Sequence, residues 1–97
     1  MTKKQIKKSD HQYCIVDHRQ YFFYEITWID PTGNSGWSDF NELSKMSCSK
    51  VITRAFIFKK TKDFIWTFSS YDSFENTFSD TNVIPTGVVK EIKKLWK

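Results

Sequence analysis

Residues 83–96 read Val-Ile-Pro-Thr-Gly-Val-Val-Lys-Glu-Ile-Lys-Lys-Leu-Trp, and this stretch is the most informative about the fold. Val83 and Ile84 are β-branched and apolar, as in a strand, and Pro85 then removes a backbone donor and ends the pairing. Gly87 permits an unusual backbone angle, so we expect a sharp corner there. The apolar pattern then resumes at positions that can return the chain to the same core: Val88, Val89, Ile92, Leu95 and Trp96.

A strand, a 3-10 turn and a last strand are typical of small β-barrels of the SH3-like or Sm-like type. Ninety-seven residues make one domain with a single modest core. Residues 1–12 are polar and lysine-rich, so we predict a basic flexible tail followed by one small β-barrel domain over 13–97. Aromatic residues are 18% of the chain. They either fill a small interior or lie in part on the surface, where exposed rings mark a ligand or a partner.

The first long strand is predicted over residues 21–30, where aromatic and β-branched residues predominate. Tyr24, Ile26 and Trp28 share one face of it, and we expect Trp28 to lie in the core. A shorter strand over 14–16 precedes it.

A loop over 30–36, rich in turn-forming residues, is followed by one short predicted helix within 37–46. Asp39 precedes Glu42 by three positions, as in a capping box. The apolar face of this helix comprises Trp37, Phe40, Leu43 and Met46.

Strands over 50–60 and 64–71 are joined by a tight turn at 61–63 and should pair as a hairpin. Either face of the strand 64–71 is compatible with the core, since a one-residue shift of register exchanges the two faces. Residues 72–81 lack a strand pattern, so we predict a long loop that covers the barrel mouth.

No enzyme constellation stands out: the chain lacks a nucleophile elbow, a glycine-rich phosphate loop and a metalloprotease helix. Its two cysteines and two histidines are not at ligand spacing, so we expect no metal and no cofactor. No apolar run approaches the roughly 20 residues of a membrane span. No secretory signal pattern is present, which favours a cytoplasmic protein.

The formal charge of +4 gathers in two lysine clusters, within 3–8 and 90–97. Such clusters attract phosphate through counterion release, as in nucleic-acid binders. Solvated lysines are the favoured interpretation, because Arg19 and Arg54 are the chain's two arginines and nucleic-acid signatures interleave arginine with lysine.

Two sets of residues are candidates for binding. Rings can stack on a planar, phosphorylated ligand while hydroxyls and a guanidinium hold its oxygens. For Trp37 burial in the core is favoured over this role, and for Arg54 pairing with a carboxylate is favoured. The candidate ligand-binding residues are Ser35, Trp37, Arg54, Ser69, Ser70 and Tyr71, and the candidate protein-interface residues are Trp66, Phe74 and Phe78.

Five short motifs follow one another along the chain: Trp28-Ile29-Asp30, Ser35-Gly36-Trp37, Ala55 before Phe56-Ile57-Phe58, Ser69-Ser70, and Ile84-Pro85 with Ile92 and Leu95. Over residues 22–96 this pattern resembles a family of short proteins encoded by tailed bacteriophages. Arg54 departs from it, since a small apolar residue is usual there. The resemblance implies an SH3-like or Sm-like barrel, an accessory role in the cytoplasm of an infected bacterium, and action against host defence.

The leading hypothesis is a non-enzymatic homo-oligomer that sequesters an anionic nucleotide-type immune signal, since open strand edges favour oligomers. A second is an inhibitor that presents Trp66, Phe74 and Phe78 to a host defence protein. The third is a nucleic-acid-binding accessory protein that uses the lysine clusters.

Overall fold

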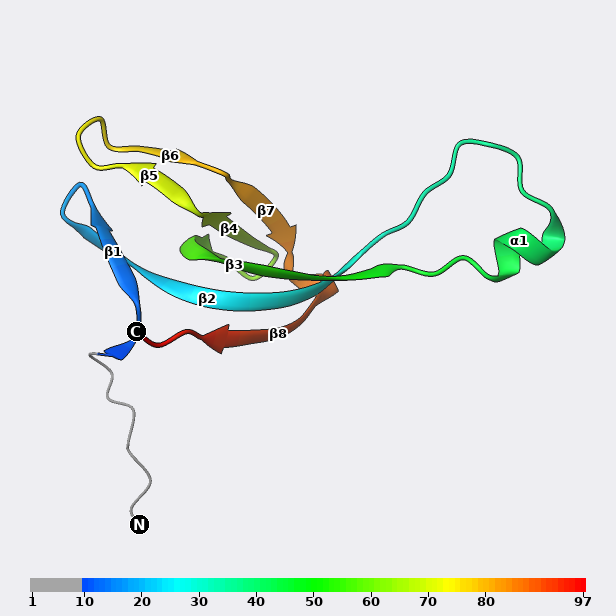
Figure 1. Cartoon of the computed structure of the whole chain (residues 1–97), viewed down its shortest axis with the longest axis horizontal. Coiled ribbons are helices and arrows are strands. Elements are labelled where there is room, and N and C mark those ends of the chain that lie inside the picture. The colour runs from blue at the N-terminus through cyan, green and yellow to red at the C-terminus, as the bar shows by residue number, and fades with distance from the viewer. Residues whose placement is uncertain (1–9) are drawn as a thin grey trace, which may run out of the picture.

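The computed structural model describes residues 10–97 as a mainly β chain with a short helix and a 3-10 turn (Figure 1), which confirms the predicted class. In chain order the elements are β1 (Tyr13–Val16), β2 (Arg19–Asp30), α1 (Phe40–Ser44), β3 (Ser49–Lys60), β4 (Phe64–Phe68), β5 (Ser70–Asp72), β6 (Thr77–Ser79), β7 (Asn82–Pro85), η2 (Thr86–Val88) and β8 (Val89–Lys94). None of the helices that the structure describes is long and apolar enough to cross a bilayer.

The main sheet is antiparallel, in the order β1-β2-β3-β4-β7, and β8 also pairs with β2. Phe23 shows where β1 and β8 meet, because its N–H donates to the carbonyl of Gln12 (2.8 Å) and its carbonyl accepts from Leu95 (3.1 Å). Both groups of one residue point to the same edge of a strand. β1 and β8 therefore lie end to end along one edge of β2, and β3 lies along the other.

The predicted tail covers residues 1–12, of which 1–9 lie outside the described residues. The N–H of Gln12 donates to the carbonyl of Leu95 at 2.9 Å. His11 forms a bridge with Trp96. Sheet pairing thus begins before the predicted start of the domain at residue 13.

The corner between β7 and β8 is the 3-10 turn η2, as predicted. The hydroxyl of Thr86 donates to the carbonyl of Lys62 (2.7 Å) and its N–H to that of Asp63 (2.9 Å), which fastens the corner to the β3–β4 turn. The unusual angle expected at Gly87 is wrong, since no glycine of residues 10–97 has a positive φ. A 3-10 turn uses right-handed helical angles that any residue adopts.

Two apolar clusters within residues 10–97 form the core, and they lie on opposite faces of the sheet. β2 contributes to both, because Tyr21 and Ile26 are five positions apart and side chains alternate between faces. The first cluster consists of Cys14, Val16, Tyr21, Phe56 and Phe68. The second cluster consists of Ile26, Ile65 and Ile84, with Tyr24, Trp28 and Ile92 among the partly buried residues packed against it.

Several predictions about the strands are confirmed. Tyr24, Ile26 and Trp28 share the second-cluster face, and β3 and β4 pair as a hairpin. In β4 the structure settles the open question of facing: Ile65 belongs to the second cluster, whereas Phe68 lies in the first cluster on the other face.

The predicted long loop over 72–81 is wrong, because β5 and β6 pair as a small hairpin there. Its turn is built by Asp72, whose carboxylate accepts from the N–H groups of Phe74 (2.9 Å) and Glu75 (3.2 Å). Asn76 adopts a φ of 57°, which asparagine tolerates better than most residues. The hairpin was missed because its three-residue strands are too short for a clear alternation.

Candidate functional site

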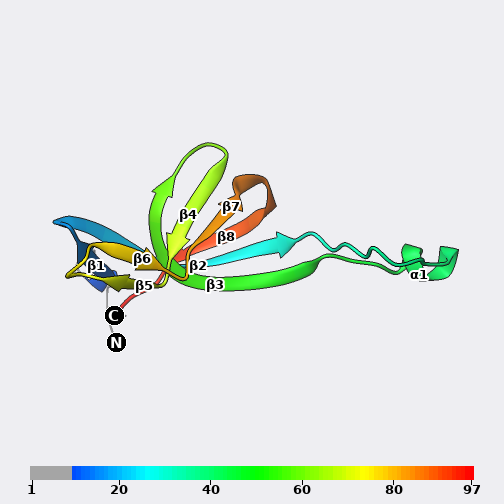
Figure 2. The same cartoon turned by 90° about the horizontal axis from the view of Figure 1, so that it is seen from above.

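Residues 31–48 form an arm that leaves the sheet between β2 and β3 and extends away from it (Figures 1 and 2). Every residue of the arm is exposed. Asp30 and Ser49, which flank the arm, are direct partners in the β2–β3 pairing. The arm is therefore an insertion between two strands that already meet without it.

Local hydrogen bonds shape the arm. Asp39 caps α1, because its carboxylate accepts from the N–H of Glu42 at 2.7 Å, as the capping pattern predicted. The side chain of Asn34 accepts from the N–H of Gly36 at 2.9 Å and turns the chain before the helix. Both hydrogen bonds join residues of the arm to each other and involve no residue of the sheet.

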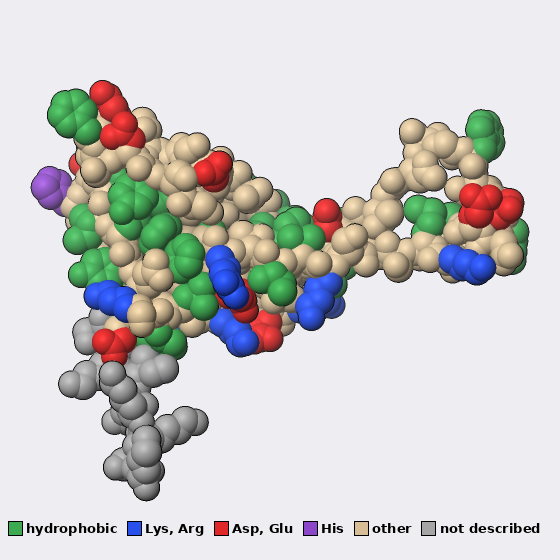
Figure 3. All heavy atoms as spheres, in the orientation of Figure 1, with side chains coloured by type: hydrophobic (Ala, Val, Ile, Leu, Met, Phe, Trp, Pro, Cys, Tyr) green, Lys and Arg blue, Asp and Glu red, His purple; other side chains and the backbone are tan. Residues whose placement is uncertain are grey.

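The apolar face of α1 is not covered by any other part of residues 10–97. Trp37 is fully exposed, Phe40 is 91% exposed and Leu43 is 63% exposed. Figure 3 shows apolar side chains at the outer end of the arm, next to carboxylates. The favoured burial of Trp37 is wrong, because a spacing of three predicts an apolar helix face but not what covers it. Phe40 and Leu43 are the residues that the sequence did not mark as functional.

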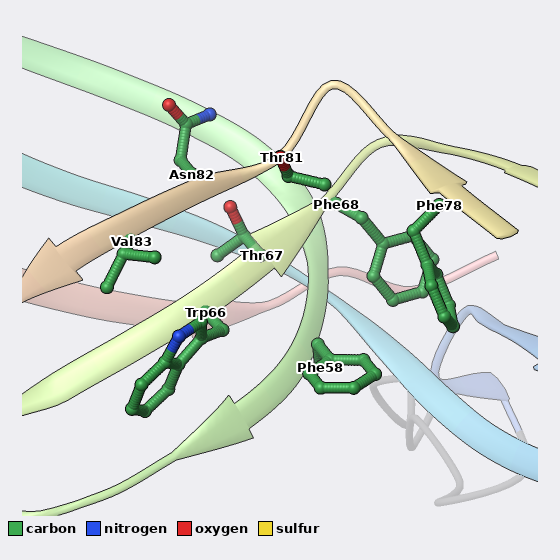
Figure 4. A pocket seen from close by; sticks show the side chains of 8 residues that line it. All are labelled: Phe58, Trp66, Thr67, Phe68, Phe78, Thr81, Asn82 and Val83. Atoms are coloured by element: carbon green, nitrogen blue, oxygen red, sulfur yellow. The ribbon is translucent and has the colours of Figure 1, made fainter.

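An aromatic pocket of about 230 Å³ is lined by residues of β3, β4, β6 and β7 (Figure 4). The amino group of Lys59 lies 4.8 Å from the centre of the Trp66 ring. Of the predicted interface residues, Trp66 and Phe78 line this pocket, whereas Phe74 is 90% exposed in the β5–β6 turn. The aromatic rings that line the pocket are Phe58, Trp66, Phe68 and Phe78.

A row of charges crosses the first-cluster face at Arg54, Glu25 and Lys93, which are cross-strand partners. The Nε of Arg54 donates to the Glu25 carboxylate at 2.9 Å, which confirms the favoured pairing with a carboxylate. The Arg54 side chain is 66% exposed, so its guanidinium also faces solvent. Lys93 and Lys94 line an open hollow beside this row, together with Leu95 and Trp96.

The predicted ligand-binding residues are divided by the fold. Ser69 donates to the carbonyl of Arg54 (3.4 Å), and the ring of Tyr71 lies 6.1 Å from that of Phe56 on the same strand as Arg54. Ser70 donates to the carboxylate of Asp80 at 2.6 Å. Ser35 and Trp37, in contrast, lie on the arm.

His11 is a buried residue that the sequence placed in the tail. Its Nε2 donates to the carbonyl of Phe23 at 2.8 Å. Its ring lies 4.7 Å from Phe22, 5.0 Å from Tyr24 and 5.3 Å from Trp96. These contacts join the beginning and the end of the described chain.

The lysine cluster at 3–8 lies outside the described residues, whereas that at 90–97 lies on and after β8. Cys14 is buried in the first cluster and Cys48 is exposed on the arm. Within residues 10–97 no group of three or more His, Cys, Asp or Glu side chains could hold a metal ion.

Comparison with protein-family models, curated proteins and solved structures gives no match for this chain.

Proposed function

We propose that this chain is a non-enzymatic binding protein that attaches to another protein through its arm. The observation that carries the proposal is the exposure of Trp37, Phe40 and Leu43 on an insertion that contributes nothing to the core. Monomeric proteins rarely expose such a group of large apolar side chains, and those that do use it for binding.

The energetics favour a covered arm. Removing one large apolar side chain from water is worth about 1.5–3 kcal/mol. Three such side chains on one short segment together contribute about 4.5–9 kcal/mol, which is comparable to the cost of about 4–15 kcal/mol that association incurs. Phe40 and Leu43 are three positions apart, which is the spacing of anchors in helices that bind grooves.

The proposal is tested with a variant in which residues 31–48 are replaced by Asn-Gly. Tagged wild type, this variant and Phe74→Ala are incubated with bacterial lysate, and size is measured in parallel by sedimentation. Phe74 is the matched control, since it is equally exposed but lies on another turn. We expect wild type and Phe74→Ala to share a partner, or a self-associated state, that the arm variant loses. Identical behaviour of all three would refute the proposal.

We also propose that the fold is a small barrel of the SH3-like or Sm-like type. Support comes from β7 and β8, which are consecutive in the chain but pair with β4 and β2, at different places in the sheet. The 3-10 turn between them and the long β2, which pairs on both edges, belong to the same pattern.

A second candidate function is the binding of a planar, anionic nucleotide beside Arg54. It is favoured by the exposed guanidinium, with Ser69 next to it and the half-exposed ring of Tyr71 nearby. Native mass spectrometry with cyclic nucleotides tests it: bound, unaltered nucleotide that is lost in Arg54→Ala supports it, and bare protein refutes it. On the resemblance to phage proteins, we propose that either activity serves an accessory role against host defence.

A further inference from the structure

We propose that the partner of the arm is a second copy of this chain, and that Trp37 of one copy inserts into the aromatic pocket of the other. The inference rests on the proposed function of the arm as a protein-binding element. One chain carries both halves of such a contact: a fully exposed indole and an aromatic pocket of about 230 Å³.

The size and chemistry of the pocket suit one aromatic side chain. An engineered apolar cavity of about 150 Å³ holds a benzene molecule, so the larger volume of this pocket has room for an aromatic ring system. The lining rings of Trp66, Phe68 and Phe78 offer faces and edges for offset or edge-to-face contacts. In Figure 4 the rings of Phe58 and Trp66 lie on the same side of β4.

Trp37 of the same copy does not reach this pocket. The ring of Tyr21 stacks on that of pocket residue Phe58 at 5.6 Å, so the pocket lies near the beginning of β2. The arm leaves from Asp30, nine residues later, which is about 30 Å along an extended strand. Seven residues from Asp30 to Trp37 span at most about 25 Å. The arm also extends away from β4 and β6 (Figures 1 and 2), which contribute pocket residues.

The charges near the two halves are complementary. On the arm the carboxylates of Asp39 and Glu42 outnumber the one lysine, Lys45. Lys59 lies over the Trp66 ring at the pocket, 4.8 Å from its centre. Asp80, next to pocket residue Thr81, has its carboxylate engaged by the hydroxyl of Ser70. Unlike charges around a buried contact fix its register and speed association.

Exchange of arms between two copies uses both arms and both pockets, so the assembly closes as a two-fold dimer. We therefore expect the full-length chain to dimerise in sedimentation velocity experiments over a concentration series. Trp37→Ala should raise the dissociation constant at least about tenfold, as for a hot-spot residue. Ile15→Ala, exposed on β1 and outside both halves, should leave it unchanged.

Val83→Trp tests the pocket from the other side. Val83 lines the pocket and is 53% exposed, so a larger side chain fits there without disturbing the core. We expect this variant to remain folded by circular dichroism and to lose dimerisation. A benzophenone amino acid at position 37 in unlabelled chain, mixed with ¹⁵N-labelled chain, should crosslink to the tryptic peptide 63–90 of the other copy.

The outcomes separate this inference from the proposal on which it rests. A chain that stays monomeric while its arm captures a different protein overturns the inference and leaves the proposed function intact. Dimers that survive Val83→Trp and crosslink elsewhere also overturn it. Dimers that survive replacement of the whole arm overturn the inference, and they refute the proposed function as well when the arm captures no other protein.

Discussion

At the scale of single residues, two threonines on the second-cluster face differ in their hydrogen bonds. The hydroxyl of Thr53 accepts from Trp28 Nε1 at 3.0 Å. Among residues 10–97, the buried hydroxyl of Thr67 has no hydrogen-bond partner. A buried polar group without a partner costs free energy that an apolar group of the same shape does not.

We therefore expect Thr67→Val to raise the free energy of unfolding by about 1 kcal/mol and Thr53→Val to lower it by a similar amount. Urea unfolding followed by circular dichroism measures both. The pair controls for the change of shape, because both substitutions replace a hydroxyl by a methyl. Destabilisation by Thr67→Val would show that its hydroxyl has a partner in solution.

The two cysteines should differ in reactivity. Burial raises the pKa of the Cys14 thiol, so at any given pH it carries less of the reactive thiolate than an ordinary thiol. Cys48 lies exposed on the arm. We expect iodoacetamide to modify Cys48 first in native protein and both residues at similar rates in urea, as measured by peptide mass spectrometry. Early labelling of Cys14 would contradict its burial.

The raised pKa also has a consequence for stability. The folded chain holds the Cys14 proton more tightly than the unfolded chain does, so this thiol contributes stability below its ordinary pKa. That contribution is lost as the pH rises through the raised pKa.

At the scale of elements, the arm should be separable from the sheet. Every residue of 31–48 is exposed, and the flanking residues Asp30 and Ser49 pair with each other in the sheet. Replacing the segment by Asn-Gly joins β2 and β3 through a turn that suits a hairpin. We expect the midpoint of thermal unfolding to remain the same or to rise. A large decrease would mean that the arm packs on the sheet in solution.

The sequence predicted most elements and few of their contacts. The runs 21–30 and 50–60 contain residues typical of strands, and the cap of α1 is defined by Asp39 and Glu42 alone, so local chemistry was sufficient for them. The β5–β6 hairpin depends on three-residue strands and was missed. Burial of Trp37 was predicted wrongly, because an apolar helix face has the same spacing whether a core or a partner covers it.

For the candidate ligand-binding residues, too, the local sequence did not show which of them lie close together. Arg54, Ser69 and Tyr71 are brought to one neighbourhood by the β3–β4 hairpin and the hairpin after it. Ser35 and Trp37 are close to each other in sequence but lie on the arm. Which distant residues meet depends on strand order and register, and neither follows from local spacing.

At the scale of the whole molecule, β2 ties the two clusters together, since it contributes Tyr21 to one and Ile26 to the other. Loss of β2 would therefore disrupt both clusters at once. We expect a single cooperative transition in urea, with the same midpoint for tryptophan fluorescence and for the exposure of Cys14 to alkylation. Two separated midpoints would show that the clusters unfold independently.

The pairing of Asp30 with Ser49 also has an evolutionary consequence. Once its two ends are held together, a loop costs only about 0.6 kcal/mol more for each doubling of its length. Mutations that change the length or the sequence of the arm should therefore have little effect on the free energy of folding. For the partner binding proposed above, selection could then change the specificity of the arm within a few substitutions while the sheet stays as it is, which suits a protein that evolves against a changing partner.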